Sequence, residues 1–152
     1  ILAVNPHGIM LSNGPGDPKD CKEVIETIKS LIGKKPIFAI CLGHQLIALA
    51  NNADTGKLKY GHRGCNHPVK DIKKDLTYIT SQNHGYTILE DSLDPEKVEI
   101  SHRNMNDNTV EGVRYKGVPM FTVQFHPEAS PGPEDTAYLF DEFIDMMQKF
   151  KD

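Results

Sequence analysis

A cysteine stands where an apolar strand passes directly into a helix. Residues 36–40 predict a short buried strand and residues 42–51 predict a helix, so Cys41 occupies the tight turn between them. A side chain in such a turn projects outward, as in a nucleophile elbow. The helix N-terminus favours the thiolate, and its unpaired N–H groups can donate to a developing oxyanion. The alternative is that Cys41 is a small buried apolar residue, as most free cysteines are.

A base for that nucleophile is offered by the run FHPE at residues 125–128. The proline holds His126 in extended backbone, and side chains two apart in an extended run point the same way. Glu128 can therefore orient the imidazole of His126, which can move a proton to and from Cys41. The run follows a predicted strand, and α/β sheets place their sites at the carboxyl ends of strands. The alternative is a surface turn with a solvated His and Glu.

Two further segments favour recognition of a small polar substrate. Gly14 and Gly16 follow a predicted strand at residues 8–12, where they allow close approach of the backbone and an N–H donor. This loop lacks the Lys and the spacing of a P-loop, so no nucleotide site is expected. In the run QNHGY at residues 82–86, Asn83 and the backbone of Gly85 could bind the charged groups of an amino acid. Taken alone, that run is typical of a hairpin turn.

The remaining polar clusters carry weaker signals. Gln45 lies four residues after Cys41 and hence on the same helical face, where its amide could orient a polar substrate. The run GHRGCNHP at residues 61–68 contains many potential ligands, but no pair has helical metal-ligand spacing with a carboxylate partner. We interpret it as an ordered loop near the site or at an interface and expect no metal. Cys65 is interpreted as incidental and Cys21 as structural or partly exposed.

The order of elements predicts an α/β fold. A strand at 8–12, a helix between Asp17 as its N-cap and Gly33, a strand at 36–40 and a helix at 42–51 are typical of a parallel sheet with helical cover. Strands predicted near 67–72, 76–81, 86–89, 98–102, 110–115 and 120–125 indicate an antiparallel or mixed extension. A final helix from Asp135 onward places apolar side chains at helical spacing for core packing.

Composition narrows the classes of function. The 152 residues suffice for one domain, and the net charge of -4 offers no electrostatic reason to expect nucleic acid or an anionic membrane. No apolar run approaches the roughly 20 residues of a membrane span. Three cysteines cannot all pair with one another, so a reducing cytoplasm is expected. The chain begins at Ile1 without a basic region, which is unlike a signal peptide and suggests that an upstream segment was removed.

In this order, the motifs resemble those of the class I glutamine amidotransferases, the triad family. They are SNGPGDP at 12–18, CLGHQL at 41–46 and QNHGY at 82–86, with HPE at 126–128. The elbow is shared with the amidotransferases of anthranilate synthase and GMP synthetase. GHRG at 61–64, NHPV at 66–69 and HPEASPGP at 126–133 are more specific to the carbamoyl-phosphate synthase branch. The resemblance runs the whole length of the chain, and no triad position is replaced.

The resemblance implies a chemistry for each of these positions. Cys41 attacks the side-chain amide of L-glutamine to form a γ-glutamyl thioester, His126 moves the proton, and Glu128 orients His126. Backbone N–H groups of Gly14 and Leu42 form the oxyanion hole. The other glutamine-binding positions are Gly16, Gln45, Asn83, Gly85 and Tyr86.

The resemblance also implies an assembly and a fold. Ammonia passes to a large synthetase subunit, where ATP, Mg and bicarbonate bind, and this chain itself holds no cofactor. The fold is a mixed, mostly parallel sheet with helices on both faces and an antiparallel extension. Residues 1–152 form one amidotransferase domain, before which an N-terminal domain and a first strand–helix–strand are expected. The alternatives are an amidotransferase of another synthetase, such as anthranilate synthase, and an inactive interaction domain.

Overall fold

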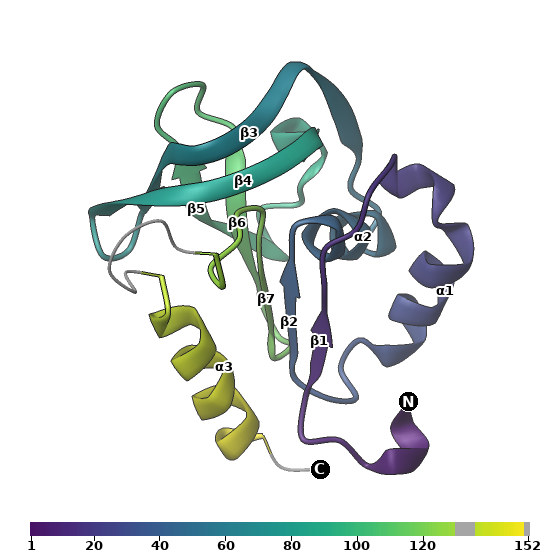
Figure 1. The fold of residues 1–152 in the computed structure, drawn as a ribbon. Helices are drawn as coiled ribbons and strands as arrows, with labels where there is room; N and C mark the ends of the chain where they lie inside the picture. Colours follow the sequence, from purple (N-terminus) through teal and green to yellow (C-terminus); the bar gives the residue numbers. More distant parts are fainter. Residues whose placement is uncertain (130–135, 151–152) are drawn as a thin grey trace.

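A seven-stranded sheet runs through the part of the chain that the computed structural model describes, residues 1–129 and 136–150 (Figure 1). The strand order is β1-β2-β7-β6-β5-β3-β4. The strands are β1 (Ile9–Leu11), β2 (Ile37–Ile40), β3 (Thr55–Asp71), β4 (Leu76–Ile88), β5 (Val98–Asn104), β6 (Val110–Tyr115) and β7 (Met120–Val123). The helices are α1 (Lys22–Leu31), α2 (Leu42–Ala50) and α3 (Tyr138–Lys149), with short 3-10 turns at Leu2–Val4, Pro18–Asp20 and Glu90–Ser92.

Three neighbouring strands, β1, β2 and β7, are parallel. Leu11 of β1 lies beside Ala39 of β2, and Ile40 at the end of β2 lies beside Val123 at the end of β7. The carboxyl ends of all three therefore reach the same edge of the sheet, where ligands bind in open α/β sheets. This places the loops that follow them, at residues 12–17, 41 and 124–129, next to one another.

The rest of the sheet is antiparallel, from β7 through β6, β5 and β3 to β4. Its largest part is the β3–β4 hairpin, whose pairing is interrupted by bulges between Lys57 and His62 and between Gly64 and His67. Gly61 and Gly64 have φ of 73° and 124°, which only glycine adopts without strain. These bulges bend the long hairpin over the edge of the sheet where the parallel strands end (Figure 1).

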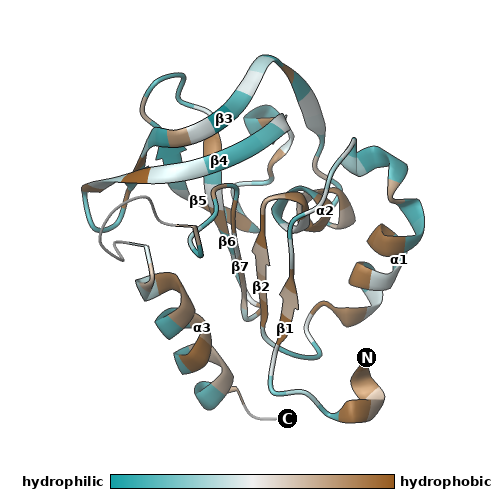
Figure 2. Ribbon diagram, in the orientation of Figure 1, coloured by the Kyte–Doolittle hydropathy of each residue, from teal (hydrophilic) through white to brown (hydrophobic). Residues whose placement is uncertain are grey.

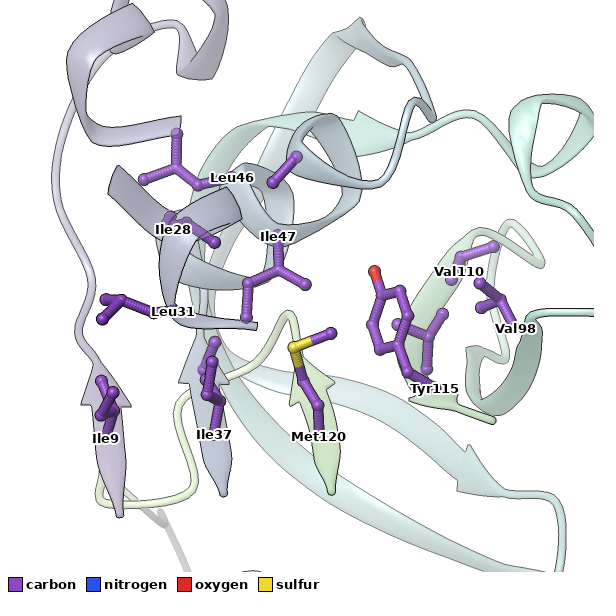
Figure 3. Packing of buried hydrophobic residues seen from close by; sticks show 13 residues of the cluster. Ile9, Ile28, Leu31, Ile37, Leu46, Ile47, Val98, Val110, Tyr115 and Met120 are labelled. Atoms are coloured by element: carbon purple, nitrogen blue, oxygen red, sulfur yellow. The ribbon is translucent and has the colours of Figure 1, made fainter. Parts of the chain in front are cut away.

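Helices cover both faces of the sheet (Figure 1). On one face, α1 and α2 pack Ile28, Leu31 and Ile47 against Ile37 and other strand residues, as Figure 3 shows. On the other face, α3 packs Leu139 and Phe143 in a second cluster. Because both faces of the central strands β2 and β7 are covered, all of their residues are buried. This burial explains why their sequences are nearly continuous runs of apolar residues. Figure 2 shows this hydrophobic centre beside a largely hydrophilic β3–β4 hairpin.

The predicted α/β class is confirmed, with a mixed sheet, helices on both faces and an antiparallel extension. Two of the strand pairings described are parallel and four are antiparallel, so the extension is larger than the sequence suggested. Asp17 does cap a helical turn, accepting from the Lys19 N–H at 2.9 Å, but this is the 3-10 turn before α1.

Two predictions for the middle of the chain are wrong. Residues 61–68 are part of β3 rather than a loop, and the QNHGY run lies inside β4 rather than at a hairpin turn. The residues of these runs that are typical of turns lie instead at or opposite the bulges of a long, irregular hairpin. Asp135 and residues 130–133 of the HPEASPGP motif lie outside the described residues.

No helix in the described part of the chain has both the length and the apolar character needed to cross a membrane.

Replacing Gly43 by Ala tests how closely α2 packs on the strands. A Cβ there would lie 2.8 Å from both the Cβ and the carbonyl oxygen of Leu11 and 3.1 Å from the Cβ of Ala39. We expect Gly43→Ala to lower the free energy of unfolding by about 1–3 kcal/mol, although Ala normally stabilises helices. Denaturant unfolding measures this. Gly85→Ala is the matched control, since its Cβ meets only the Arg63 guanidinium at 3.7 Å, and equal stability of the two variants would contradict the account.

Candidate active site

Cys41 occupies a sharp turn between β2 and α2. Its backbone has φ 55° and ψ −105°, a region that residues with a Cβ rarely enter, and α2 begins at the next residue, Leu42. The Cys41 N–H donates to the carbonyl oxygen of Val123 at 2.9 Å, which anchors the turn to β7. The structure therefore has the strained strand-to-helix geometry that the sequence predicted for a nucleophile elbow.

His126 reaches Cys41 from the loop after β7. The N–H of His126 donates to the carbonyl oxygen of Ser81 at 2.9 Å, and its Nδ1 lies 2.8 Å from a Glu128 carboxylate oxygen. A hydrogen bond with Cys41 and then the one with Glu128 raise the pKa of His126 to about 10, against the opposing effect of burial. Because Nδ1 faces Glu128, the other ring nitrogen is the one available to Cys41.

Glu128 stands behind His126 and is half exposed. Partial burial alone would raise the pKa of its carboxyl group, but the hydrogen bond with His126 and the charge of that ring lower it overall. The arrangement thus favours an imidazolium between two groups that can be anionic. It has the geometry of a nucleophile, a base and an orienting carboxylate.

A cavity of about 570 Å³ opens at Cys41. Its lining includes Cys41, His126 and all seven residues that the sequence predicted for glutamine binding, and Glu128 is outside the lining. The full lining comprises Asn13, Gly14, Pro15, Gly16, Cys41, Leu42, Gln45, Lys57, Arg63, Asn83, His84, Gly85, Tyr86 and His126. The loops after β1, β2 and β7 thus form the cavity together with β3 and β4 of the antiparallel hairpin.

Hydrogen bonds hold these walls together. Nε2 of Gln45 donates to the carbonyl oxygen of Tyr86 at 2.8 Å and to Oε1 of Gln124 at 2.9 Å, so this amide group joins α2 to β4 and to the loop after β7. The carbonyl oxygen of Asn83 is 4.0 Å from the Cys41 sulfur. A Cβ on Gly14 would lie 2.8 Å from Cδ2 of Leu42, so glycine here allows the two predicted oxyanion-binding segments to approach each other.

Sequence reasoning missed Gln124 and Lys57, and it gave Arg63 no role although the run that contains Arg63 was expected near the site or at an interface. Gln124 is fully buried, and its Nε2 donates to the Cys41 sulfur at 3.7 Å. Its position two residues before His126 in an extended run was a usable signal. Lys57 and Arg63 add positive charge to the cavity, which suits a ligand with a carboxylate. Their place in the lining was not predicted because the bulged pairing of β3 with β4 brings them there.

Other titratable groups do not belong to the arrangement of Cys41, His126 and Glu128. His44, within the elbow motif, is fully buried with Nδ1 2.7 Å from Oγ1 of Thr122, and it does not line the cavity. Nitrogen and carboxylate atoms of His62, His84 and Glu111 come within 4.8 Å of one another, and of these three residues His84 lines the cavity. A second cavity of about 540 Å³, between α3 and β6, is lined by charged residues such as Arg114 and has no cysteine.

A family model described as "Glutamine amidotransferase class-I" matches residues 1–146. The chain therefore belongs to the class I glutamine amidotransferase family, as its motifs predicted. It is 60% identical over 146 residues to the carbamoyl phosphate synthase small chain of Clostridium acetobutylicum, covering 96% of this chain and 42% of that protein. It is 59% identical over 150 residues to the one of Bacillus caldolyticus, covering 99% and 41%. The chain thus spans about two fifths of the length of these curated relatives.

The fold is similar to a crystal structure of a putative GMP synthase protein from Thermoplasma acidophilum. The TM-score is 0.76 with 24% sequence identity, over 95% of this chain and 74% of that one. At this identity, the likeness supports the α/β fold alone.

Glu128→Gln tests the electrostatic link between Glu128 and His126. The raised pKa means that the hydrogen bonds of His126 with Cys41 and with Glu128 together stabilise the folded chain fully below pH about 6.5, and this contribution is lost as the pH rises through about 10. The variant should lower the pKa of His126 toward its ordinary value, so the loss of folding stability with rising pH should begin at lower pH. An NMR titration of His126 measures the shift. Glu90→Gln, which removes a carboxylate paired with Arg103, is the control, and an unchanged His126 titration in Glu128→Gln would refute the link.

Proposed function

We propose that the chain hydrolyses L-glutamine as the amidotransferase part of a carbamoyl-phosphate synthase. The observation that supports it most is the convergence of Cys41, from the turn after β2, with His126 and Glu128, from the loop after β7, at a cavity lined by all the predicted glutamine-binding residues. The identity to carbamoyl phosphate synthase small chains favours this synthase over anthranilate synthase.

The geometry supports a two-stage reaction. The Cys41 thiolate attacks the side-chain amide carbon of glutamine, and the oxyanion accepts hydrogen bonds from the N–H groups of Leu42 and Gly14. His126 gives its proton to the nitrogen, the C–N bond breaks, and ammonia leaves a γ-glutamyl thioester on Cys41. Water then attacks this thioester while His126 takes a proton, and glutamate leaves with the thiolate restored. Glu128 holds the ring of His126 in place throughout.

Substrate recognition follows from the charges and backbone of the cavity. Lys57 and Arg63 supply positive charge for the α-carboxylate of glutamine, and the backbone near Asn83 and Gly85 supplies donors and acceptors for its other polar groups. Gly16 lets the loop after β1 approach the substrate closely. Tyr86 and Gln45 hold the opposite wall together.

We further propose the setting of the reaction. The 152 residues form one amidotransferase domain of a longer protein, as the fraction of its relatives that the chain spans suggests. Ammonia is passed to a large synthetase subunit, which binds ATP, Mg and bicarbonate. The free state of Cys21, Cys41 and Cys65 is consistent with a reducing cytoplasm. Association with a purified carbamoyl-phosphate synthase large subunit, rather than with an anthranilate synthase partner, would support this assignment.

Cys41→Ala tests the reaction itself. Removal of the nucleophile should reduce glutamine hydrolysis by at least about a thousandfold, because neither Cys21 nor Cys65 lines the cavity to form the thioester in its place. Ammonia release measures the rate, and acid quenching followed by mass spectrometry detects the glutamyl group on Cys41. Cys65→Ala, at an exposed cysteine outside the cavity, is the control and should leave the rate unchanged. Hydrolysis that survives in Cys41→Ala would refute the proposed function.

A further inference from the structure

A cluster of titratable side chains reaches the cavity through His84 and takes no part in the proposed reaction. His62 comes from β3, His84 from β4 and Glu111 from β6, and Asp107 lies in the turn before β6. His62 and His84 are 8% and 7% exposed, and Glu111 is fully buried. Buried groups of this kind are costly unless their hydrogen bonds and charges are matched, so their arrangement requires an explanation.

The hydrogen bonds of His84 determine where its proton lies. Its Nδ1 is 2.7 Å from the carbonyl oxygen of Tyr86, which can only accept, so Nδ1 carries a proton. Burial lowers the pKa of His84 to about 4, so the ring is neutral and this is its one N–H. Nε2 therefore has a lone pair. It lies 2.8 Å from Oε1 of Gln82, another acceptor, and 3.3 Å from Nδ1 of His62.

His62 supplies the missing donor. Its Nε2 donates to Oδ2 of Asp107 at 2.6 Å, and its Nδ1 faces Nε2 of His84 and, at 3.5 Å, a carboxylate oxygen of Glu111. The bond with Glu111 and the pairing with Asp107 raise the pKa of His62 to about 9 despite burial. The ring of His67, 5.4 Å away, is the other titratable neighbour that contacts it. At neutral pH both nitrogens of His62 therefore carry protons.

We propose that His62 is a positioning residue for the glutamine cavity: its Nδ1 proton is shared with Nε2 of His84 and thereby holds Tyr86, in the cavity wall, in place. Oε1 of Gln82, 2.8 Å from Nε2 of His84, can only accept, so it cannot supply a proton to that nitrogen, whereas Nδ1 of His62 at 3.3 Å can. That proton also fixes the tautomer of His84, whose remaining N–H can then only point at Tyr86.

The Tyr86 carbonyl oxygen links this cluster to the nucleophile. It accepts from Nδ1 of His84 at 2.7 Å and from Nε2 of Gln45 at 2.8 Å. Gln45 also donates to Gln124, whose own amide donates to the sulfur of Cys41. Loss of the shared proton should shift the cavity wall and weaken glutamine binding, while the groups that carry out the chemistry stay in place.

Nitrogen-15 NMR of the histidine side chains tests the hydrogen bonds directly. At pH 7 we expect protons on both nitrogens of His62 and on Nδ1 alone of His84, with His62 losing one proton near pH 9. Asp107→Asn, at a part-exposed position, should lower the pKa of His62, and Glu111→Gln should do the same. His7→Gln, at an exposed histidine outside the cluster, is the control. A neutral His62 at pH 7, or a proton on Nε2 of His84, would overturn the proposal.

Glutamine hydrolysis tests the positioning role, and this part rests on the proposed function. His62→Gln should raise KM for glutamine roughly 10- to 100-fold and change kcat only about twofold. KM of the unmodified chain should rise above pH 9, and Asp107→Asn should move that rise to lower pH. A variant that merely unfolds would lose kcat instead, and His7→Gln should match the unmodified chain. An unchanged KM in His62→Gln would overturn the positioning role.

Failure of the proposed function can be distinguished from failure of the inference about His62. If the unmodified chain does not hydrolyse glutamine, the proposed function is contradicted, while the NMR spectra still decide whether His62 and His84 share a proton. Tight binding of one Zn²⁺ to the Cys41→Ala chain, with displacement of the His62 Nδ1 proton, would overturn the inference by showing that a cation other than the proton occupies this position.

Discussion

The backbone of Cys41, held at φ 55° and ψ −105° between β2 and α2, is the constraint on which the rest of the site depends. A residue with a Cβ is strained in this region, so the neighbouring structure must hold it there. Its N–H is bonded to Val123 in β7, and α2 is fixed close to the sheet because Gly43 packs against Leu11 and Ala39. The same turn directs the sulfur toward the edge where the parallel strands end.

Charge and hydrogen bonding then organise the groups around that sulfur. His126 lies between Cys41 and Glu128, and each of these partners favours its protonated form. Across the cavity, the amides of Gln45 and Gln124 connect the sulfur to the Tyr86 carbonyl oxygen in β4 and hence to the buried histidines. The cavity is thus bounded on one side by parallel-strand loops and on the other by an antiparallel hairpin, with hydrogen bonds joining the two.

The sequence was most informative where the chemistry depends on local geometry. The elbow at Cys41 and the pairing of His126 with Glu128 follow from neighbouring residues, because strand-to-helix turns and proline-held extended runs are local structures. The run at residues 82–86 was misread as a turn because Asn and Gly occur both in hairpin turns and in bulged hairpins. The places of Lys57 and Arg63 and the His62–His84 contact depend on the β3–β4 register, which local patterns do not specify.

The most direct test of the account is labelling of the chain by a glutamine-like electrophile, with free glutamine as competitor, followed by intact-mass measurement and peptide mapping. If the site is assembled as described, Cys41 reacts selectively although it is only 3% exposed, and glutamine protects it. The exposed Cys65 and the partly buried Cys21 remain unlabelled under the same conditions. Faster labelling of Cys65, with no protection of Cys41 by glutamine, would contradict the account.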